Sequence, residues 1–202
     1  MAEQVFPTKG NLMKIKKSLE LARTGFDLLD RKRNILVRET MALIDTAEEI
    51  QGQINTTYKR AYAALQKANI TLGLVEEIAE AIPEEDSIQI SSRSVMGVEI
   101  PMVSIEKKEL KNHFGYRRTS SQLDEAYARF DEVKLLTARL AEIENSVYRL
   151  AQGIKKTQKR ANALKNIIIP RFEEQVKFIS DSLDEKEREE FSRLKVIKKQ
   201  LG

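Results

Sequence analysis

The sequence predicts a mainly α protein: a long antiparallel two-helix coiled coil with a short β-hairpin between the helices. Three observations lead to this fold class. A heptad repeat of apolar residues runs from Leu12 to Ile82, and a second apolar repeat runs from Leu123 to Leu201. Between the two, the helical period stops and β-branched residues become dense. A long helix with one apolar seam cannot bury it alone, so it must pair with another helix.

The first helix carries its seam at positions a and d of the heptad. The a positions are Leu12, Leu19, Phe26, Arg33, Thr40, Ala47, Ile54, Ala61, Ala68, Val75 and Ile82. The d positions are Ile15, Ala22, Leu29, Leu36, Leu43, Ile50, Thr57, Ala64, Thr71 and Ile78. Only the arginine and the threonines in these series are not apolar, which makes the pattern typical of a coiled coil.

We expect this helix to occupy residues 1–82. Thr8 can cap its start because a threonine oxygen accepts from the free amides of the first turn. Pro83 disfavours helical backbone at the residue before it, so the helix should end near Ala81.

Residues 83–118 are predicted to form a β-hairpin followed by a loop that contains His113, the single histidine. Met96-Gly97 supplies the tight turn. The strands are marked by Ile88, Ile90 and Val95 before the turn, and by Val98, Ile100, Val103 and Ile105 after it. Pro101 confines the second strand to a sheet edge or a bulge. A lone hairpin is marginally stable in water, so it should pack on the helices or on a partner.

Residues 119–202 are predicted to form the second long helix, opening near Ser120 with Thr119 and Gln122 as a capping box. Its seam consists of Leu123, Ala126, Phe130, Val133, Leu136, Leu140, Ile143, Val147, Leu150, Ile154, Ala161, Leu164, Ile168, Phe172, Val176, Ile179, Leu183, Phe191, Leu194, Ile197 and Leu201. The phase of this pattern slips near residues 133–140 and again near 164–176, which changes the supercoil locally. Pro170 predicts a helix kink.

If the chain folds back near Ile100, Leu12 faces Leu194. Arg33 and Thr40 then face Pro170, so the two polar a positions would lie beside the kink.

The composition suits long helices exposed to water rather than a deep globular core. Charged residues make up 33% of the chain and aromatic residues 6%, with no Trp. No Cys is present, which excludes disulfides and thiolate metal sites and favours a reducing compartment. No apolar run is long enough for a membrane span and no signal sequence is recognisable, so we expect a soluble cytosolic protein.

The sequence offers little chemistry. It contains no G-x-x-x-x-G-K-[ST] loop and no G-x-G-x-x-G motif. Acid pairs such as Glu84-Glu85 and Glu189-Glu190 are better explained as solvated surface charges than as acid–base catalysts. A two-helix rod offers no deep pocket. We therefore expect no enzyme activity, no cofactor and no metal.

Charge is unevenly distributed: residues 155–171 contain six basic and no acidic side chains, whereas acids dominate residues 173–190. Each block is compatible with an ordinary solvated helix face, but it also suggests that different parts of the helices meet different partners. Nucleic-acid binding is disfavoured because the basic clusters lack interleaved aromatic residues.

Two stretches at opposite ends resemble the signatures of one family, the D subunit of V-type and A-type rotary ATPases. The N-terminal stretch contains Pro7-Thr8-Lys9, Leu12, Lys16, Leu19, Ala22, Gly25, Leu28-Leu29, Lys32-Arg33 and Leu36. The C-terminal stretch contains Lys156-Thr157, Arg160, Asn162-Ala163-Leu164, Ile169-Pro170, Leu183, Glu185, Glu187-Arg188, Phe191 and Arg193-Leu194-Lys195. The resemblance spans nearly the whole chain, and the hairpin region matches only in character.

This resemblance implies a non-catalytic central rotor shaft of an ATPase or ATP synthase. The two termini would enter a hexameric head of catalytic A and B subunits. The other end would bind the small F subunit of the central stalk and a funnel-shaped rotor subunit above the membrane ring, at the cytoplasmic face and without insertion into the membrane.

The expected contacts fall in two groups. Contacts with the head are expected at Lys9, Lys14, Lys16, Lys17, Arg23, Lys155, Lys156, Lys159, Arg160, Arg188, Arg193, Lys195 and Lys198. Lower-stalk contacts are expected at Ile88, Ile90, Val98, Ile100 and Val103.

Two other classes fit the periodicity. A chaperone similar to prefoldin also pairs an antiparallel coiled coil with a hairpin, but its helix tips should expose apolar residues to bind unfolded chains. A passive coiled-coil scaffold or spacer is the second alternative. The terminal signatures favour the rotor shaft over both.

Overall fold

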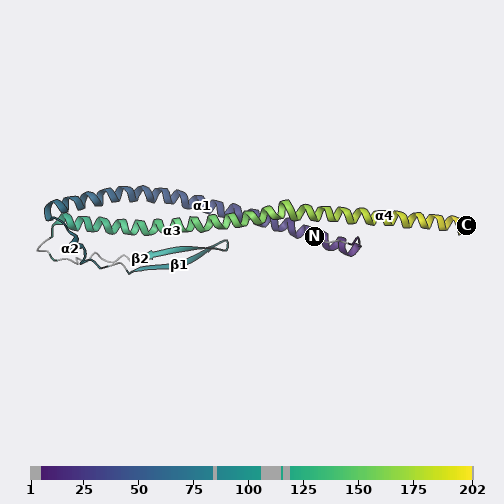
Figure 1. Ribbon diagram of the computed structural model, residues 1–202, viewed down its shortest axis with the longest axis horizontal. Coiled ribbons are helices and arrows are strands. Elements are labelled where there is room, and N and C mark those ends of the chain that lie inside the picture. Colours follow the sequence, from purple (N-terminus) through teal and green to yellow (C-terminus); the bar gives the residue numbers. More distant parts are fainter. Residues whose placement is uncertain (1–5, 84–85, 106–114, 116–118, 202) are drawn as a thin grey trace. The chain divides into compact units, whose positions relative to one another are not determined.

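The computed structural model describes residues 6–83, 86–105, 115 and 119–201. The chain is 82% helical, with a two-stranded antiparallel hairpin between its long helices, which confirms the predicted fold class. Its elements are α1 (Lys9–Leu72), α2 (Glu76–Ala79), β1 (Ile88–Val95), β2 (Val98–Ile105), α3 (Ser121–Ala163), the π-helical segment η2 (Leu164–Ile168) and α4 (Ile169–Leu201) (Figure 1).

These elements form two compact units. The terminal unit comprises Met1–Asn34 and Ile154–Gly202, and the middle unit comprises Ile35–Gly153.

The predicted seam of the first helix is confirmed as far as Ala68, whereas Thr71 is exposed and Val75, Ile78 and Ile82 lie beyond the end of α1 at Leu72. All buried residues of α1 lie at predicted a or d positions: Ala22, Leu36, Ile50, Ile54, Thr57, Ala61, Ala64 and Ala68. The start is also as expected, because the Asn11 amide donates to Thr8 Oγ1 at 3.2 Å, the contact of an N-cap residue.

The end of the first helix differs from the prediction. Helix α1 ends at Leu72, well before Ala81, because Gly73 adopts a φ of +80°. Its amide donates to the Asn69 carbonyl at 2.9 Å, the arrangement of a glycine that closes a helix in the left-handed conformation. Only the four-residue helix α2 follows before Pro83.

The hairpin turn is confirmed at Met96-Gly97. Both residues have positive φ, 50° and 73°, as a two-residue type I′ turn requires. The register is continuous from Val95 opposite Val98 to Ile88 opposite Ile105, and it includes Pro101 without a bulge. The residues of the predicted loop 106–118, including His113, lie outside the described residues except Gly115.

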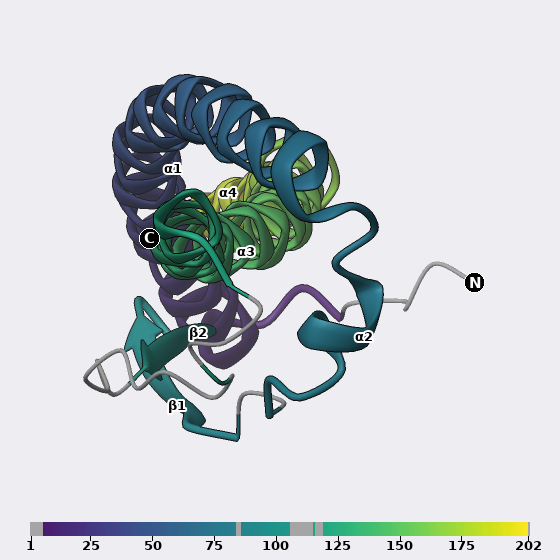
Figure 2. The same ribbon diagram turned by 90° about the vertical axis from the view of Figure 1, so that its left-hand side faces the viewer.

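In the middle unit, α1 and α3 lie side by side and antiparallel (Figures 1 and 2). Ile50, Ile54 and Ile143 form a buried cluster. Nearer the C-terminal end of α1, the Tyr62 ring meets the Phe130 ring edge-on with centroids 5.5 Å apart. Among the described residues, most of the buried apolar side chains belong to this unit.

The start of the second helix corrects the capping-box prediction. Helix α3 begins at Ser121, and the Thr119 hydroxyl donates to the Gly115 carbonyl at 3.3 Å instead of capping the helix. Gln122 Oε1 accepts from the Thr71 hydroxyl at 2.6 Å, so it joins the two helices rather than closing a box.

Candidate interaction surfaces

In the terminal unit, the two helical segments are antiparallel and joined by polar pairs at their flanks. Lys9 Nζ lies 2.9 Å from Glu187 Oε1, and Arg23 Nη2 lies 2.6 Å from Glu173 Oε1. Arg33 Nη1 donates to Gln158 Oε1 at 2.9 Å.

These pairs correct the expected register. Arg33 meets Gln158 and therefore does not lie beside Pro170, and Lys9 already lies opposite Glu187, so Leu12 is not opposite Leu194. The prediction was wrong because it assumed helices of equal reach around a turn near Ile100, whereas α1 ends at Leu72.

The ion pair of Lys9 and Glu187 shifts the pKa of both groups. The hydrogen bond and the charge of Glu187 raise the pKa of Lys9, and those of Lys9 lower the pKa of Glu187. Both side chains are exposed, so solvent screens their attraction.

The basic residues expected to contact a head are all exposed on the helices of the terminal unit. Two of them have neighbours within α4: Arg193 Nη2 lies 3.8 Å from Glu189 Oε2, and Lys195 Nζ lies 6.0 Å from the centre of the Phe191 ring. In residues 155–171, Lys165 Nζ lies 5.8 Å from the centre of the Phe26 ring. All the expected head contacts are therefore open to solvent, although Lys9, Arg23 and Arg193 also form ion pairs with carboxylates of this chain.

The last part of the predicted seam is not buried by this chain. Phe191, Leu194 and Ile197 are 67%, 65% and 49% exposed. The physical reason is the position of Lys9, which begins α1 and already pairs with Glu187. Helix α1 begins at Lys9 and therefore does not extend over the residues that follow Glu187, which leaves an apolar stripe of α4 open to water.

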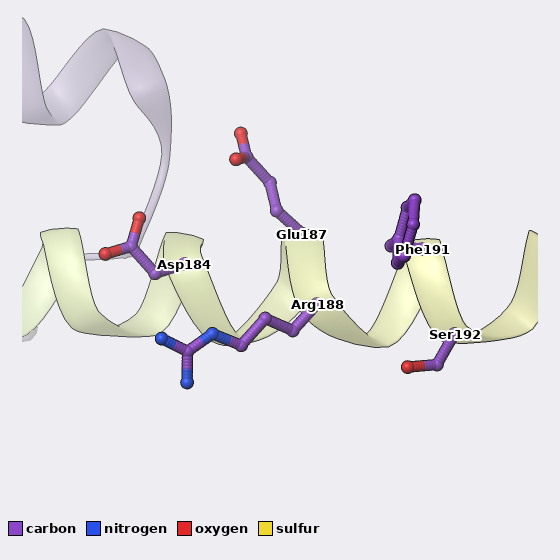
Figure 3. A pocket seen from close by; sticks show the side chains of 5 residues that line it. All are labelled: Asp184, Glu187, Arg188, Phe191 and Ser192. Carbon is purple, nitrogen blue, oxygen red and sulfur yellow. The ribbon is translucent and has the colours of Figure 1, made fainter.

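Helix α4 carries a shallow hollow on its surface. All of its lining residues come from this one helix: Asp184, Glu187, Arg188, Phe191 and Ser192. Figure 3 shows Glu187 and Phe191 pointing to one side of α4, and Arg188 and Ser192 to the other. These side chains do not converge on a common point, so the hollow does not have the form of a small-molecule site.

The hairpin packs on α3 through a row of polar contacts that the sequence did not reveal. The Val103 amide donates to Glu142 Oε2 at 2.9 Å, and the Ser146 hydroxyl to the Pro101 carbonyl at 3.4 Å. Arg149 Nη1 donates to the Glu99 carbonyl at 3.3 Å. All three α3 residues lie on one helix face, because they are spaced by four and three positions.

The row ends at Gly153. A Cβ atom placed there would lie 2.7 Å from Val98 Cγ2, closer than non-bonded carbon atoms approach each other. The glycine therefore lets β2 lie directly against α3. A sequence pattern cannot reveal such a contact, because the residues are far apart in the chain and the helix shows no local irregularity at that point.

The hairpin residues expected to contact a lower stalk differ in exposure. Ile88 and Ile90 on β1 are 46% and 75% exposed, whereas Ile100 on β2 is 2% exposed and belongs to the core of the middle unit. Val98 and Val103 are half-buried. Among these five, β1 presents the larger apolar surface.

The described part of the chain offers neither a metal site nor a membrane span. Within it, no group of three or more His, Cys, Asp or Glu side chains could hold a metal ion. Among the described helices, none is both long and apolar enough to cross a membrane.

Known proteins match this chain along almost all of it. The family model for the D subunit of ATP synthase matches residues 11–199. The chain is 48% identical over 200 residues to the D subunit of the V-type ATP synthase of Thermotoga neapolitana, a match that covers 98% of each protein.

Archaeal relatives match over a similar extent. Identity to the D subunit of the A-type ATP synthase of Thermococcus kodakarensis is 40% over 205 residues, covering 98% of this chain and 96% of the relative. Identity to the corresponding protein of Pyrococcus horikoshii is 36% over 200 residues, covering 96% and 94%. These matches confirm the resemblance drawn from the two terminal stretches.

Proposed function

This chain belongs to the family of ATP synthase D subunits, and on that basis we propose that it is the central rotor shaft of a V/A-type ATPase or ATP synthase. In this role it carries torque between a hexameric head of A and B subunits and the ion-translocating ring in the membrane. It is not itself catalytic, and it works at the cytoplasmic face as a peripheral part of the complex. Its further partners are the F subunit of the central stalk and the funnel-shaped rotor subunit.

The observation that carries this proposal is the match over residues 11–199, because it includes both helical regions and the hairpin. The helices add physical support. An antiparallel pair with a continuous apolar seam resists twisting, since each turn is held by its neighbour. Transmission of torque requires that resistance.

The open end of α4 supports insertion into a head. Phe191, Leu194 and Ile197 form an apolar stripe without a partner in the described chain, and the charged residues between and directly after them, Arg193, Lys195, Lys198 and Lys199, are all basic. A stripe of this composition is complementary to the wall of a cavity in the head that offers both apolar and acidic surface.

The basic residues at 155–171 support electrostatic guidance within the head. Exposed ion pairs each contribute about 0–1 kcal/mol, so a shaft guided by them is not trapped at one angle. Replacement of Lys155, Lys156, Lys159 and Arg160 by glutamate should alter ATP hydrolysis that is coupled to ion transport. The control variant carries the same kind of change, replacement by glutamate, at Lys59, Arg60 and Lys67, which are exposed on the middle unit. Unchanged turnover and coupling in the first variant would contradict the electrostatic role.

The shaft proposal itself is tested by co-purification with A and B subunits. We expect one copy of this chain per hexamer, and loss of ion transport when it is omitted. A hexamer that assembles, hydrolyses ATP and drives ion transport equally well without this chain would contradict the proposal.

The exposed apolar stripe of α4 favours a second function, that of a chaperone similar to prefoldin. Such a protein needs exposed apolar residues at its helix tips. Suppression of the aggregation of an unfolded test protein measures this activity. We expect none at stoichiometric concentration, because under the shaft proposal this stripe is covered inside the assembled complex.

A further inference from the structure

The π-helical segment η2, Leu164–Ile168, interrupts an otherwise α-helical run in the terminal unit. The amide of Ile169 donates to the Leu164 carbonyl, five residues back rather than four. A π turn of this kind holds one more residue than an α turn. The segment therefore acts as a local insertion of one residue.

The helix before the segment follows a regular heptad. Thr157 and Ala161 are buried and Leu164 is half-buried, at spacings of four and three residues. Leu164 faces α1, because a Cβ atom on Gly25 would lie 3.7 Å from Leu164 Cδ1. This part of the seam is in phase with its partner.

If the same heptad continued through α4, Arg171 and Phe178 would occupy the seam. The structure places them outside it: Arg171 is exposed and Phe178 is 59% exposed. The residues that follow each of them take the seam positions instead. Phe172 is half-buried, and Ile179 is fully buried at 0% exposure.

The seam after η2 is thus displaced by one residue relative to the seam before it. One residue corresponds to about 100° of rotation around an α-helix, enough to turn an apolar face away from its partner. Without a correction, the Arg171 guanidinium would be directed at α1, and burial of an unpaired charge is costly.

We propose that η2 is a one-residue phase correction that rotates α4 so that Phe172 and Ile179, rather than Arg171 and Phe178, pack against α1. The position of Pro170 fits this role. Proline has no amide to bond back to the carbonyl of Asn166, so a regular α turn is already weakened there. The widened turn and the proline fall at the same place in the helix.

The first test measures which residue lies in the seam. The full chain has no native cysteine, so single cysteines can be introduced at Phe178 and Ile179 and labelled with a maleimide. The F178C chain should react faster than the I179C chain by about tenfold or more, since a buried thiol reacts only when the structure opens locally. Equal rates, or slower labelling of F178C, would overturn the proposal.

The second test removes the insertion. Deletion of Asn166 together with Pro170→Ala produces an uninterrupted α-helix whose heptad runs from Leu164 through Phe172 and Ile179. I179C should therefore remain slow to label in this variant. Pro170→Ala alone is the control for the proline.

A deletion elsewhere in α4 provides the matched comparison. Removal of Lys177, which is exposed in a regular part of the helix, brings Ser180 into the seam in place of Ile179, and I179C should label rapidly. Rapid labelling after deletion of Asn166 as well would contradict the proposal. Loss of helical circular dichroism in the Asn166 variant would also count against it, because a compensating insertion can be removed without loss of pairing.

Discussion

The middle unit and the terminal unit bury their apolar seams to different extents. In the middle unit, α1 and α3 enclose a row of buried side chains, and the hairpin adds Ile100 to the core. In the terminal unit, few side chains are fully buried, and exposed ion pairs flank the seam. A helix pair that covers its own surface needs no partner, whereas the open end of α4 has apolar surface left for one.

The largest effect is expected from loss of core volume in the middle unit. Leu150 is fully buried at 0% exposure, so Leu150→Ala should lower the free energy of unfolding by about 2–5 kcal/mol. The matched control is Leu194 in the terminal unit, which is 65% exposed. Leu194→Ala should change the free energy of unfolding by less than about 0.5 kcal/mol. Urea denaturation of the isolated chain measures both. Similar losses for the two variants would remove the distinction between the units.

The next effect concerns the attachment of the hairpin to α3. Glu142 accepts from the Val103 amide, so Glu142→Ala should destabilise this contact by about 1–3 kcal/mol. Glu142→Gln keeps an acceptor oxygen and should retain most of the stability. Hydrogen exchange at the Val103 amide reports the contact directly. Unchanged exchange in the alanine variant would show that the amide is protected by other means.

A smaller effect is expected at the close approach of β2 to α3. Gly153→Ala gains helix propensity but forces Val98 aside, and we expect a net loss of about 1 kcal/mol. Gly52 has open space around it, so Gly52→Ala should instead stabilise the chain by about 1 kcal/mol.

Addition of Val98→Ala to Gly153→Ala tests the cause, since it makes room for the new methyl group and should recover part of the loss. A stabilised G153A chain would show that the hairpin does not press on this turn of the helix.

The smallest effect is expected from the exposed pair of Lys9 and Glu187. Because the pKa of Glu187 is lowered, its ion pair stabilises the folded chain at pH values above the ordinary pKa of a carboxyl group. This stabilisation is lost as the pH falls through the lowered pKa. Because the pKa of Lys9 is raised, the same pair stabilises the folded chain at pH values below the ordinary pKa of an amine. This stabilisation is lost as the pH rises through the raised pKa.

The pair is therefore intact at neutral pH and is lost in strong acid and strong base. Titration of Glu187 by NMR should give a higher pKa in the Lys9→Met chain than in the unmodified chain. The same pKa in both chains would mean that the two groups do not interact in solution.

The sequence predicted the features that repeat or depend on neighbours in the chain. The seam of α1 is periodic, so each buried residue supports the assignment of the next, and all of them lie at the expected positions. The turn at Met96-Gly97 and the cap at Thr8 are local, and both could be predicted from the residue types.

Features that depend on contacts between distant segments could not be predicted in the same way. The close packing at Gly153 arises only when β2 is placed on α3. The register failed because it depends on where α1 ends, and a glycine inside a helical pattern gives no certain sign of termination. The phase slip near residues 164–176 was visible in the sequence, but its form, a π turn before Pro170, was not.

The candidate contacts with partners were predicted from residue type and from the family resemblance, without a periodic pattern. The basic residues of the terminal unit are exposed, and their contact with a head stays a prediction from residue type and position. Ile100 shows the limit of the apolar pattern, because a strand residue expected to face a partner is buried by its own chain.

Rotation of this chain inside an assembled head is the most direct test of the proposed role. Ser92→Cys on the exposed strand β1 provides a single attachment point for a bead, because the chain has no other cysteine. With the A and B subunits fixed to a surface, addition of ATP should make the bead turn continuously in one direction. A head that hydrolyses ATP with this chain bound and the bead stationary would contradict the account.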